Sequence, residues 1–313
     1  MDVSIIIVNL NSRQLLQECL SSVYQHTHGI AFEVIVVDNA SSDGSVEMVN
    51  TQFPQVRLIE NTVNNRYAIA NNQGLEIVQG KYVLYLNGDT VLTGNSVKAL
   101  RDFLEKTPDA GGVGGPMMYP DGRYQEACFR FPSAVNVFYL LCLARFYWNT
   151  PLAANYPQLQ HQQKPRTVDF VVGACFMARR RVLEHCHGMD PDYYFYGEDS
   201  DLCYRIWKAG WKVYYSPQGP PVIHYGGISS TINLFDNNQR TKHLWGWKSR
   251  FLFIKKHYPG WRRFGIVLST FGAFGVNTVL YGLAAFRRRE WNYFRVNIGI
   301  HAEIVRAAGH LIK

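Results

Sequence analysis

The sequence predicts an α/β fold with a mostly parallel central sheet, followed by a basic helical tail. Short apolar runs alternate with amphipathic segments over the first 90 residues, which is typical of a parallel sheet with helical crossovers. The charge of the chain changes near its C-terminus, which marks the tail. At 313 residues, of which 47% are hydrophobic and 18% charged, the chain is long enough for a packed core and an appendage.

The first 90 residues are expected to alternate buried strands with helices. Uninterrupted apolar runs predict the strands, at 3–8, 34–37, 56–59 and 82–86. The helix after the first strand has one apolar stripe, formed by Leu15, Leu16, Cys19, Leu20 and Val23. Capping residues at Ser41–Gly44 predict the start of a second helix, and Gly80 ends a third near 67–78. Strands joined in this way take right-handed crossovers.

The alternation of apolar strands and amphipathic helices stops in the middle of the chain and resumes later. Residues 131–165 look irregular and are expected to form a loop or a lid-like insertion. Regular structure is expected again at 168–178. The acidic segment 196–201 precedes a helix, whose apolar stripe consists of Leu202, Cys203, Ile206 and Trp207. A short strand is expected at Val222-Ile223.

Missing motifs argue against several classes of protein. No G-x-G-x-x-G follows the first strand and no G-x-x-x-x-G-K-[ST] occurs, which disfavours dinucleotide-binding and P-loop proteins. The six cysteines form no Cys-x-x-Cys pair, so neither a zinc site nor a disulfide framework is expected. Reduced cysteines of a cytosolic protein are the simpler interpretation. No secretory signal precedes the first apolar run.

Polar residues follow the predicted strands at the edge where open parallel sheets bind ligands. Asn9 ends the first strand, Asp38 the second, and Asn87 and Asp89 follow the fourth. Asp38 could accept hydrogen bonds from a nucleotide base or ribose, or could open a turn. Asp89 could hold a divalent cation that neutralises a diphosphate, or could be an ordinary turn residue. His224, after the last short strand, could be a ligand or a structural histidine.

The densest acidic cluster is Glu198-Asp199-Ser200-Asp201, at the start of a predicted helix. Asp199 lies near the helix N-terminus, where the helix dipole favours the ionised carboxylate that a general base needs. Asp201 and Arg205 are spaced as an i,i+4 ion pair. The simpler alternative is that these acids only cap the helix.

Seven segments match the sequence pattern of one known family in order. They are V-S-I-I-I-V-N-L-N at Val3–Asn11, V-I-V-V-D-N-A-S-S-D-G at Val34–Gly44, N-N-R-Y-A-I-A-N-N-Q-G at Asn64–Gly74, Y-V-L-Y-L-N-G-D-T at Tyr82–Thr90, V-V-G-A-C-F-M-A-R-R at Val171–Arg180, F-Y-G-E-D-S-D-L-C-Y-R at Phe195–Arg205 and V-I-H-Y-G-G-I-S-S at Val222–Ser230. As an ordered set they resemble glycosyltransferase family 2, which has the GT-A fold. The resemblance spans about residues 1–258 and is strongest to the bacterial rhamnosyltransferase-like branch.

The resemblance implies roles for the matching residues on the donor side. Asp38 would contact the nucleotide base, and Asn9 and Arg66 would line the donor pocket. Asp89 stands where the family's metal-binding D-x-D motif ends. Asn87 replaces the first Asp of that motif, a variant common in this branch.

Further roles follow from the later segments of the resemblance. Asp199 matches the catalytic base of the family's E-D motif, and Glu198 is its neighbour. His224 matches a second ligand on the metal side, and the metal is expected to be Mg²⁺ or Mn²⁺. Gly173 and Ala174 are expected to contact substrate.

The activity that the resemblance implies is inverting transfer of one sugar from a nucleotide-diphosphate donor to a hydroxyl of a glycan. The branch favours dTDP-L-rhamnose as donor and a lipid-linked glycan of cell-surface polysaccharide synthesis as acceptor; UDP-hexoses and galactofuranose donors stay open. A sugar nucleotidyltransferase would need a Gly-rich basic loop after the first strand, which residues 9–13 do not provide. A non-catalytic membrane adaptor on a transferase fold would not need the intact acidic and histidine set.

The C-terminal part differs from the rest in charge. Residues 231–313 hold 14 Lys and Arg against 3 Asp and Glu, a net charge of +11, whereas residues 1–230 carry a net −3. Residues 264–286 are an uncharged run of 23, followed by Arg287–Arg289. Such an asymmetry predicts an anionic partner for the tail.

A GT-A catalytic domain is therefore expected at 1–244 and a basic, aromatic helical tail at 245–313. The tail is expected to lie in a membrane interface as a monotopic element, because basic and aromatic residues flank a moderately apolar segment. A spanning helix and a buried or dimer-forming helix are the alternatives, and homo-oligomerisation is left open. The protein would then work at the cytoplasmic face of the inner membrane. Nucleic acid is not an expected partner, because the N-terminal part is acidic.

Overall fold

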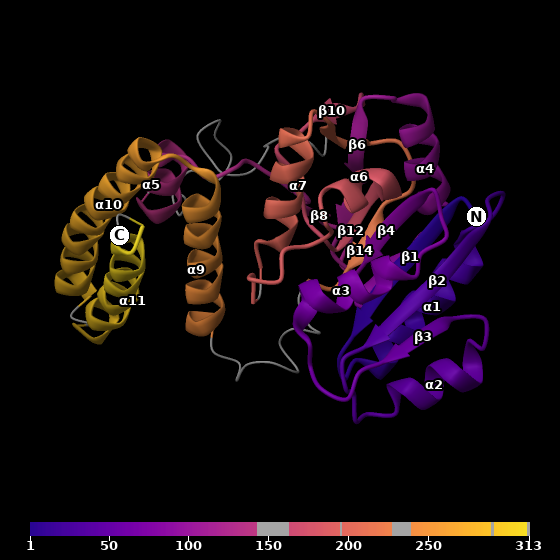
Figure 1. Ribbon diagram of the computed structural model, residues 1–313. Coiled ribbons are helices and arrows are strands. Elements are labelled where there is room, and N and C mark those ends of the chain that lie inside the picture. Colours follow the sequence, from indigo (N-terminus) through magenta and orange to yellow (C-terminus); the bar gives the residue numbers. More distant parts are fainter. Residues whose placement is uncertain (143–162, 195, 227–238, 289–290, 312–313) are drawn as a thin grey trace. The chain divides into compact units, whose positions relative to one another are not determined.

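The computed structural model describes residues 1–142, 163–194, 196–226, 239–288 and 291–311. The chain divides into two compact units, Met1–Phe129 with Gln158–Asn237 and Arg130–Pro157 with Asn238–Lys313. The first unit contains the sheets, and the described elements of the second are helices (Figure 1).

Among the described residues, the central sheet has eight strands in the order β10-β13-β6-β12-β4-β1-β2-β3. In chain order these are β1 (Val3–Asn9), β2 (Phe32–Asp38), β3 (Arg57–Glu60), β4 (Tyr82–Leu86), β6 (Ala110–Gly114), β10 (Arg166–Thr167), β12 (Cys175–Arg179) and β13 (Lys212–Tyr215). The predicted strands of the first 90 residues are thereby confirmed to within a few residues at their ends.

The central sheet is mixed, which corrects the expectation of a mostly parallel one. The strands β4, β1, β2 and β3 are parallel neighbours, as predicted. β12, however, is antiparallel to both of its neighbours, β4 and β6. The chain reaches β12 through a long excursion rather than through a βαβ crossover, so the handedness rule for crossovers does not set its direction.

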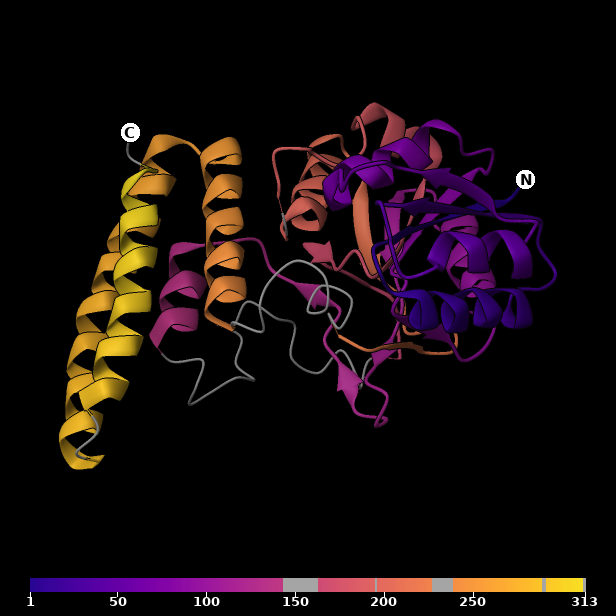
Figure 2. The same ribbon diagram turned by 90° about the horizontal axis from the view of Figure 1, so that it is seen from below.

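Helices cover both faces of this sheet (Figures 1 and 2). α1 (Arg13–His26) and α2 (Ser45–Gln52) carry the chain from β1 to β2 to β3 in one direction across the sheet. α3 (Arg66–Glu76) carries it back past β1 to β4. The strand order therefore reverses between β1 and β4, and open α/β sheets bind ligands beyond the strand ends at such a point.

The core consists of the apolar runs that predicted the strands. The side chains of β2 at Val34–Val37 are fully buried, and so is nearly all of β4. The predicted stripe of α1 is confirmed at four of its positions, since Leu16, Cys19, Leu20 and Val23 are buried. All six cysteines are buried and form no disulfide with one another.

The glycine-rich segment after residue 109 forms a central strand, β6, that sequence composition did not indicate. A Cβ atom on Gly112 would lie 2.3 Å from the ring of Phe176 on the neighbouring β12. Glycine is thus required by the close packing of Phe176, although glycine ordinarily weakens a strand.

Two smaller sheets bring distant segments to the edge of the central one. One has the order β5-β14-β7-β8, and the other pairs β11 with β9. Their strands are β5 (Thr90–Leu92), β7 (Met117–Met118), β8 (Tyr124–Gln125), β9 (Cys128–Phe129), β11 (Phe170–Val171) and β14 (Val222–His224). Among its described residues this unit also contains the helices α4 (Ser96–Lys106), α6 (Arg180–His185) and α7 (Glu198–Lys208).

The second unit contains α5 (Ala134–Cys142), α9 (Gln239–His257), α10 (Gly260–Arg288) and α11 (Trp291–Gly309). α10 packs against both α5 and α11, and α9 against α11. α10 and α11 lie side by side in both ribbon views (Figures 1 and 2). The division at 244 and 245 stays a prediction, and the structure adds α5 to the C-terminal helices.

The expectation of irregular structure at 131–165 is wrong for α5. Ser133 and Asn136 cap this helix reciprocally: Ser133 N donates to Asn136 Oδ1 over 2.7 Å, and Asn136 N to Ser133 Oγ over 3.2 Å. This S-x-x-N signal resembles a capping box and could have been read from the sequence. Residues 143–162 of the predicted insertion lie outside the described residues.

Candidate functional site

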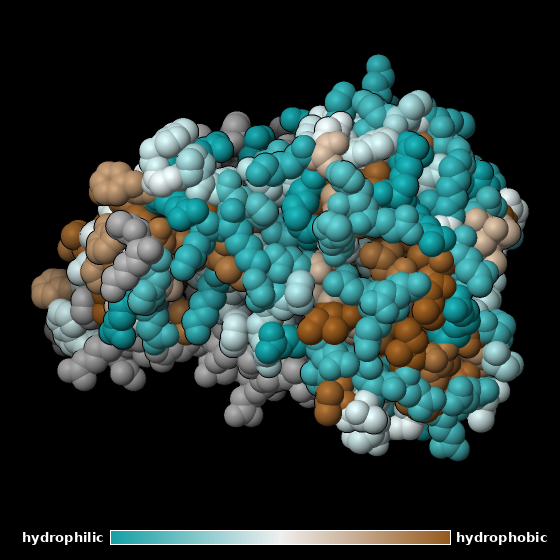
Figure 3. Space-filling view, in the orientation of Figure 1, coloured by the Kyte–Doolittle hydropathy of each residue, from teal (hydrophilic) through white to brown (hydrophobic). Residues whose placement is uncertain are grey.

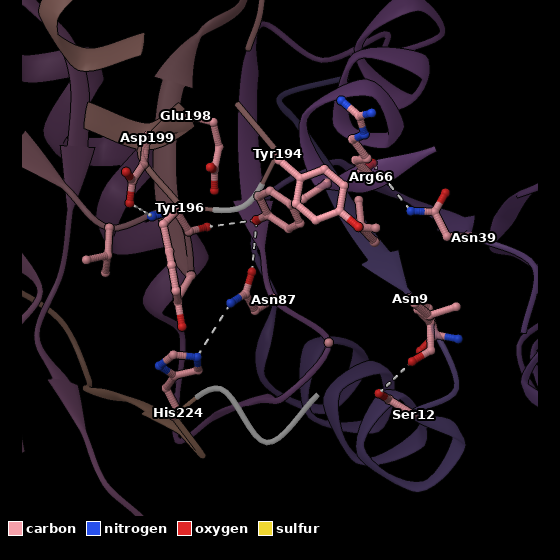
Figure 4. A pocket seen from close by; sticks show the side chains of 18 of the residues that line it. Asn9, Ser12, Asn39, Arg66, Asn87, Tyr194, Tyr196, Glu198, Asp199 and His224 are labelled. Atoms are coloured by element: carbon pink, nitrogen blue, oxygen red, sulfur yellow. Dashed lines mark hydrogen bonds between the residues drawn. The ribbon is translucent and has the colours of Figure 1, made fainter. Parts of the chain in front are cut away.

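A cavity of about 880 Å³ opens where the carboxyl ends of β1 and β4 meet (Figure 4). It lies at the reversal of strand order, where a ligand site is expected. Its walls include the predicted site residues Asn9, Arg66, Asn87, Gly173, Ala174, Glu198, Asp199 and His224. The two other predicted residues, Asp38 and Asp89, are buried behind this wall.

Asp38 supports the wall of the cavity through hydrogen bonds at the end of β2. Its Oδ2 accepts from Asn9 Nδ2 over 2.8 Å, and its Oδ1 accepts from Ser41 N over 2.8 Å. Asp38 is only 2% exposed, whereas Asn9 beside it lines the cavity. The geometry therefore orients Asn9, and a contact of Asp38 with a nucleotide base stays a prediction.

Asp89 and His224 meet although 135 residues separate them in the chain. β14 pairs with β5 so that His224 lies opposite Thr90, next to Asp89. His224 Nε2 is 3.4 Å from Asp89 Oδ1. A carboxylate oxygen and an imidazole nitrogen thus point toward one place, which local sequence could not show.

Gln125 orients His224 from the other side. Gln125 Oε1 lies 3.1 Å from His224 Nδ1, and the Gln125 side chain comes from β8, which is separated from β14 by β7 in the same small sheet. An amide oxygen accepts the Nδ1 proton, which leaves the lone pair of Nε2 on the side of Asp89. Sequence reasoning missed Gln125, because no local motif marks it.

This geometry fits a divalent cation held by Asp89 and His224. Neighbouring ligands of an octahedral ion with bonds of about 2.1 Å lie about 3 Å apart, close to the observed 3.4 Å. Metal-binding histidines commonly donate their second ring N–H to an oxygen, as His224 does to Gln125. Within the described part of the chain no group of three or more His, Cys, Asp or Glu could hold a metal. Phosphate oxygens and water would have to complete the coordination.

The side-chain amide of Asn87 is held in one orientation. Tyr67 Oη donates to Asn87 Oδ1 over 2.9 Å, and Asn87 Nδ2 lies 3.5 Å from His224 Nε2 (Figure 4). Tyr67 also approaches Gly173 O at 3.4 Å, so it links two walls of the cavity. Asn87 therefore presents an N–H donor, which is no metal ligand, toward the His224 side of the cavity.

Glu198 and Asp199 stand at the start of α7, as predicted, and both line the cavity. Asp199 Oδ2 accepts from Gly173 N over 3.2 Å and Oδ1 from Ser200 N over 2.6 Å. Burial raises the pKa of Asp199, contrary to the expected dominance of the helix dipole, and these two N–H groups lower it. Burial and the charge of Asp199 raise the pKa of Glu198 to about 8. Because the two N–H groups stabilise the ionised form of Asp199 and the charge of Asp199 disfavours that of Glu198, a proton shared by the pair is favoured on Glu198.

Asp201, by contrast, takes no part in the cavity. Its carboxylate is fully buried and pairs with Arg205, whose Nη2 lies 2.6 Å from Asp201 Oδ2. The predicted i,i+4 pair is therefore confirmed, and it stabilises α7.

We expect Glu198→Gln to stabilise the protein in a pH-dependent way. The stability that the neutral Glu198 carboxyl contributes is fully present below its ordinary pKa of 4.5 and is lost as the pH rises to about 8. Each pH unit in this window costs up to about 1.4 kcal/mol. Gln stays neutral throughout, so the Tm of the variant should exceed that of the wild type near pH 8, by about 2–4 °C per kcal/mol, and the gap should close toward pH 4.5. A difference in Tm between variant and wild type that does not change with pH would contradict a protonated Glu198 in the folded protein.

Aromatic and strained residues form another part of the wall. Arg66 and Tyr196 have positive φ angles, +67° and +64°, a conformation that non-glycine residues adopt mainly at constrained sites. The Arg66 guanidinium lies 4.8 Å from the centroid of the Tyr194 ring, a cation–π contact. Tyr194 and Tyr196 line the cavity and were missed, although the aromatic run before Gly197 marks them. Phe195, in one of the matched segments, lies outside the described residues, as do residues 227–230 of another.

Solved structures resemble the fold of this chain. One is the mannosyltransferase PcManGT from Pyrobaculum calidifontis in complex with GDP-mannose and Mn²⁺; it has a TM-score of 0.55 and 16% identity, over 99% of this chain and 86% of that one. GalNAc-T7 with UDP, GalNAc and Mn²⁺ has a TM-score of 0.58 and 16% identity, over 82% of this chain and 48% of that one. At these identities the likeness shows a GT-A-like fold.

Curated relatives are similar over most of this chain. The N-acetylglucosaminyl-diphospho-decaprenol L-rhamnosyltransferase of Mycobacterium tuberculosis is 26% identical over 280 residues, 86% of this chain and 89% of that protein. The O-antigen biosynthesis protein RfbC of Myxococcus xanthus is 26% identical over 229 residues, 72% of this chain and 17% of that protein. The model of glycosyl transferase family 2 matches residues 4–186, more than half of the chain. With the cavity and its carboxylates at the strand ends of a GT-A-like sheet, this match shows that the chain is a glycosyltransferase and belongs to glycosyl transferase family 2.

Proposed function

We propose that this glycosyltransferase moves L-rhamnose from dTDP-L-rhamnose to a hydroxyl of a lipid-linked glycan, with inversion at the anomeric carbon. The observation that carries the proposal is the convergence of two kinds of group on one cavity. Asp199 supplies a carboxylate, and His224, with Asp89 behind it, supplies the ligands for a diphosphate-bound cation. A base and a site for a charged leaving group are the parts that a single displacement requires.

In the proposed reaction, the Asp199 carboxylate takes the proton of the acceptor hydroxyl as its oxygen attacks the anomeric carbon. The N–H groups of Gly173 and Ser200 hold both oxygens of Asp199 in place. The transition state resembles an oxocarbenium ion. When bound, a divalent cation held by Asp89 and His224 would neutralise charge on the departing nucleotide diphosphate.

The remaining wall residues bind the donor in this proposal. Asn9 and Arg66 line the nucleotide side, and Gly173 and Ala174 contact the sugar. The oriented N–H of Asn87 donates to a phosphate oxygen, which explains how an Asn can replace the first Asp of the D-x-D motif. Mn²⁺ in two structural neighbours supports Mg²⁺ or Mn²⁺ as the cofactor.

The choice of sugar and acceptor is supported by the mycobacterial relative, whose name states an L-rhamnosyl transfer to N-acetylglucosaminyl-diphospho-decaprenol. A lipid-linked acceptor would place this enzyme at the cytoplasmic face of the inner membrane, where the basic C-terminal part would meet the inner leaflet. Nucleic acid is not a proposed partner, and homo-oligomerisation is left open.

A thermal-shift screen of nucleotide sugars with Mn²⁺ or Mg²⁺ tests the donor. A ligand of the native state raises the apparent stability by about 2.7 kcal/mol at 100 times its Kd. We expect dTDP-L-rhamnose to raise the Tm more than UDP-hexoses or UDP-galactofuranose, and only with the cation. A larger shift from a UDP-sugar would reassign the donor, and no shift from any nucleotide sugar would refute the proposal.

Gln125→Leu should weaken cation binding, since the amide would no longer hold His224 in the tautomer that presents Nε2. Losing such a partner of a metal ligand typically costs about 10–100-fold in metal affinity. Titration calorimetry with Mn²⁺ in the presence of dTDP measures the effect. Gln125→Glu is the matched control, because its carboxylate still accepts the Nδ1 proton and should preserve the affinity. Equal affinities of the Leu variant and the wild type would show that Gln125 does not position His224.

A further inference from the structure

The long helix α10 has one face that belongs to the protein interior. Thr270 and Asn277 are buried on this face. Asn277 Nδ2 donates to Leu141 O over 2.7 Å, and Cys142 Sγ lies 3.6 Å from Ala273 O. The helix is thus attached to α5 by packing and by polar contacts along its length.

The opposite face of α10 carries large apolar side chains that remain open to solvent. Six of them are between 49% and 76% exposed, namely Phe264, Leu268, Phe271, Val279, Leu283 and Phe286. Their spacings of 3, 4 and 8 residues keep them on one side of a helix. The stripe runs for about 33 Å. In Figure 3, brown and tan side chains are seen among hydrophilic ones over the helices labelled α10 and α11 in Figure 1.

This two-faced arrangement distinguishes an in-plane helix from a spanning one. Within the described residues, the segment Gly260–Leu283 is long and apolar enough to cross a membrane by length and composition alone. A helix that crosses a membrane by itself meets lipid on every side. α10 instead packs against α5 and α11, with Asn277 bonded to Leu141 O of α5, so only its other face is free for lipid. A helix with one apolar face of this kind lies along the interface.

Charge indicates which partner would bind the exposed apolar face of α10. The exposed Arg262 and Arg287 stand at its two ends. Residues 231–313 contain 14 basic and only 3 acidic residues, so a second copy would bring like charge to the contact. An anionic lipid surface offers the opposite charge. Trp261 and Trp291, 75% and 57% exposed, lie near the ends of the helix, and Trp favours the headgroup region.

We propose that the exposed face of α10 docks on a bilayer that contains anionic lipid, with the helix axis parallel to the membrane. This inference deepens the proposed function, on which it rests for its biological purpose, because a lipid-linked acceptor is reached from such a position. The binding itself needs no donor and no acceptor.

Cosedimentation of the full-length protein with vesicles tests the docking surface. The probes are vesicles of phosphatidylcholine alone and of phosphatidylcholine with phosphatidylglycerol, at low salt. The wild type should sediment with the anionic vesicles and much less with the neutral ones. The double variant Leu268→Gln, Val279→Gln should lose about tenfold or more in vesicle affinity. The matched control is Val63→Gln, which changes a side chain of similar exposure, 60%, in the other unit and should bind as the wild type does.

Several results would overturn the docking surface. The wild type could fail to sediment with anionic vesicles. The double variant at Leu268 and Val279 could bind them as tightly as the wild type does, or the control variant could lose as much affinity as the double variant. A concentration-dependent dimer in sedimentation velocity, abolished in the same variant, would assign the face to a second copy instead. Thermal unfolding of each variant confirms folding, and its donor-induced Tm shift is recorded in parallel. Loss of that shift in every variant and in the wild type, with vesicle binding intact, would refute the proposed function and leave the docking surface standing.

Discussion

Asp199→Asn should abolish sugar transfer, with a loss of about 10²–10⁴-fold in turnover, and should leave donor binding in place. The amide has the size of the carboxylate but cannot take the proton of an acceptor hydroxyl. The Asn oxygen can accept from only one of Gly173 N and Ser200 N, because its amide nitrogen donates, so thermal unfolding of the variant is compared with that of the wild type to separate folding from chemistry. The measurements are the initial rate of nucleoside-diphosphate release with acceptor, and the donor Kd by calorimetry.

Glu198→Gln is the matched control for this experiment. Glu198 already holds a proton near neutral pH, since burial and the neighbouring charge raise its pKa to about 8. Its amide variant should therefore lose far less turnover than Asp199→Asn. If Asp199→Asn turns over at nearly the wild-type rate while Glu198→Gln is inactive, the role of base passes to Glu198.

Asp89→Ala should weaken cation and donor binding together. A cation held by Asp89, His224 and the donor diphosphate links the two sites, so each ligand strengthens the other by the same factor. Such couplings are typically about 5–150-fold. In the wild type, chelation of the cation should raise the Kd of the donor by a factor in this range. In Asp89→Ala the donor should bind weakly with and without Mn²⁺.

Asp109→Asn provides a control for the removal of a carboxylate elsewhere. Asp109 forms a half-exposed surface pair with Lys212 and is no part of the cavity wall. This variant should keep the full metal dependence of donor binding. Full wild-type activity in excess EDTA would refute the metal-dependent part of the mechanism.

The sequence was sufficient to predict the first half of the central sheet. Buried parallel strands are apolar at nearly every position, and this pattern placed the ends of β1, β2 and β4 to within two residues. The strand β6 was not recognised, because its glycines are required by a contact with Phe176 that only the fold creates. The helix α5 was missed despite its capping signal at Ser133 and Asn136, because eight of its nine residues are apolar and no polar face marks a helix.

The site was predictable where it follows single strands or a helix start. Asn9, Asn87 and Asp199 stand at such places, and the structure brings all three into one cavity. The pairing of His224 with Asp89 depends on β14 and β5, which are far apart in the chain. Long-range partners such as Gln125 leave no local pattern at all.

In the C-terminal part, too, the sequence did not show which segments would pack together. Its uncharged run and its basic flanks were visible in the sequence, but not the side of α10 that α5 covers. Helical spacing alone gives two candidate faces, and the buried Asn277 and the exposed Phe271 decide between them.

Transfer by one displacement is tested most directly by the anomeric configuration of the product. The wild type is incubated with dTDP-L-rhamnose, Mn²⁺ and a lipid-linked or synthetic N-acetylglucosaminyl acceptor, and the new linkage is examined by NMR, with Asp199→Asn as the inactive control. A single attack assisted by Asp199 predicts a linkage of the opposite anomeric configuration to the donor. A product that retains the donor's configuration would require two displacements and would contradict the mechanism.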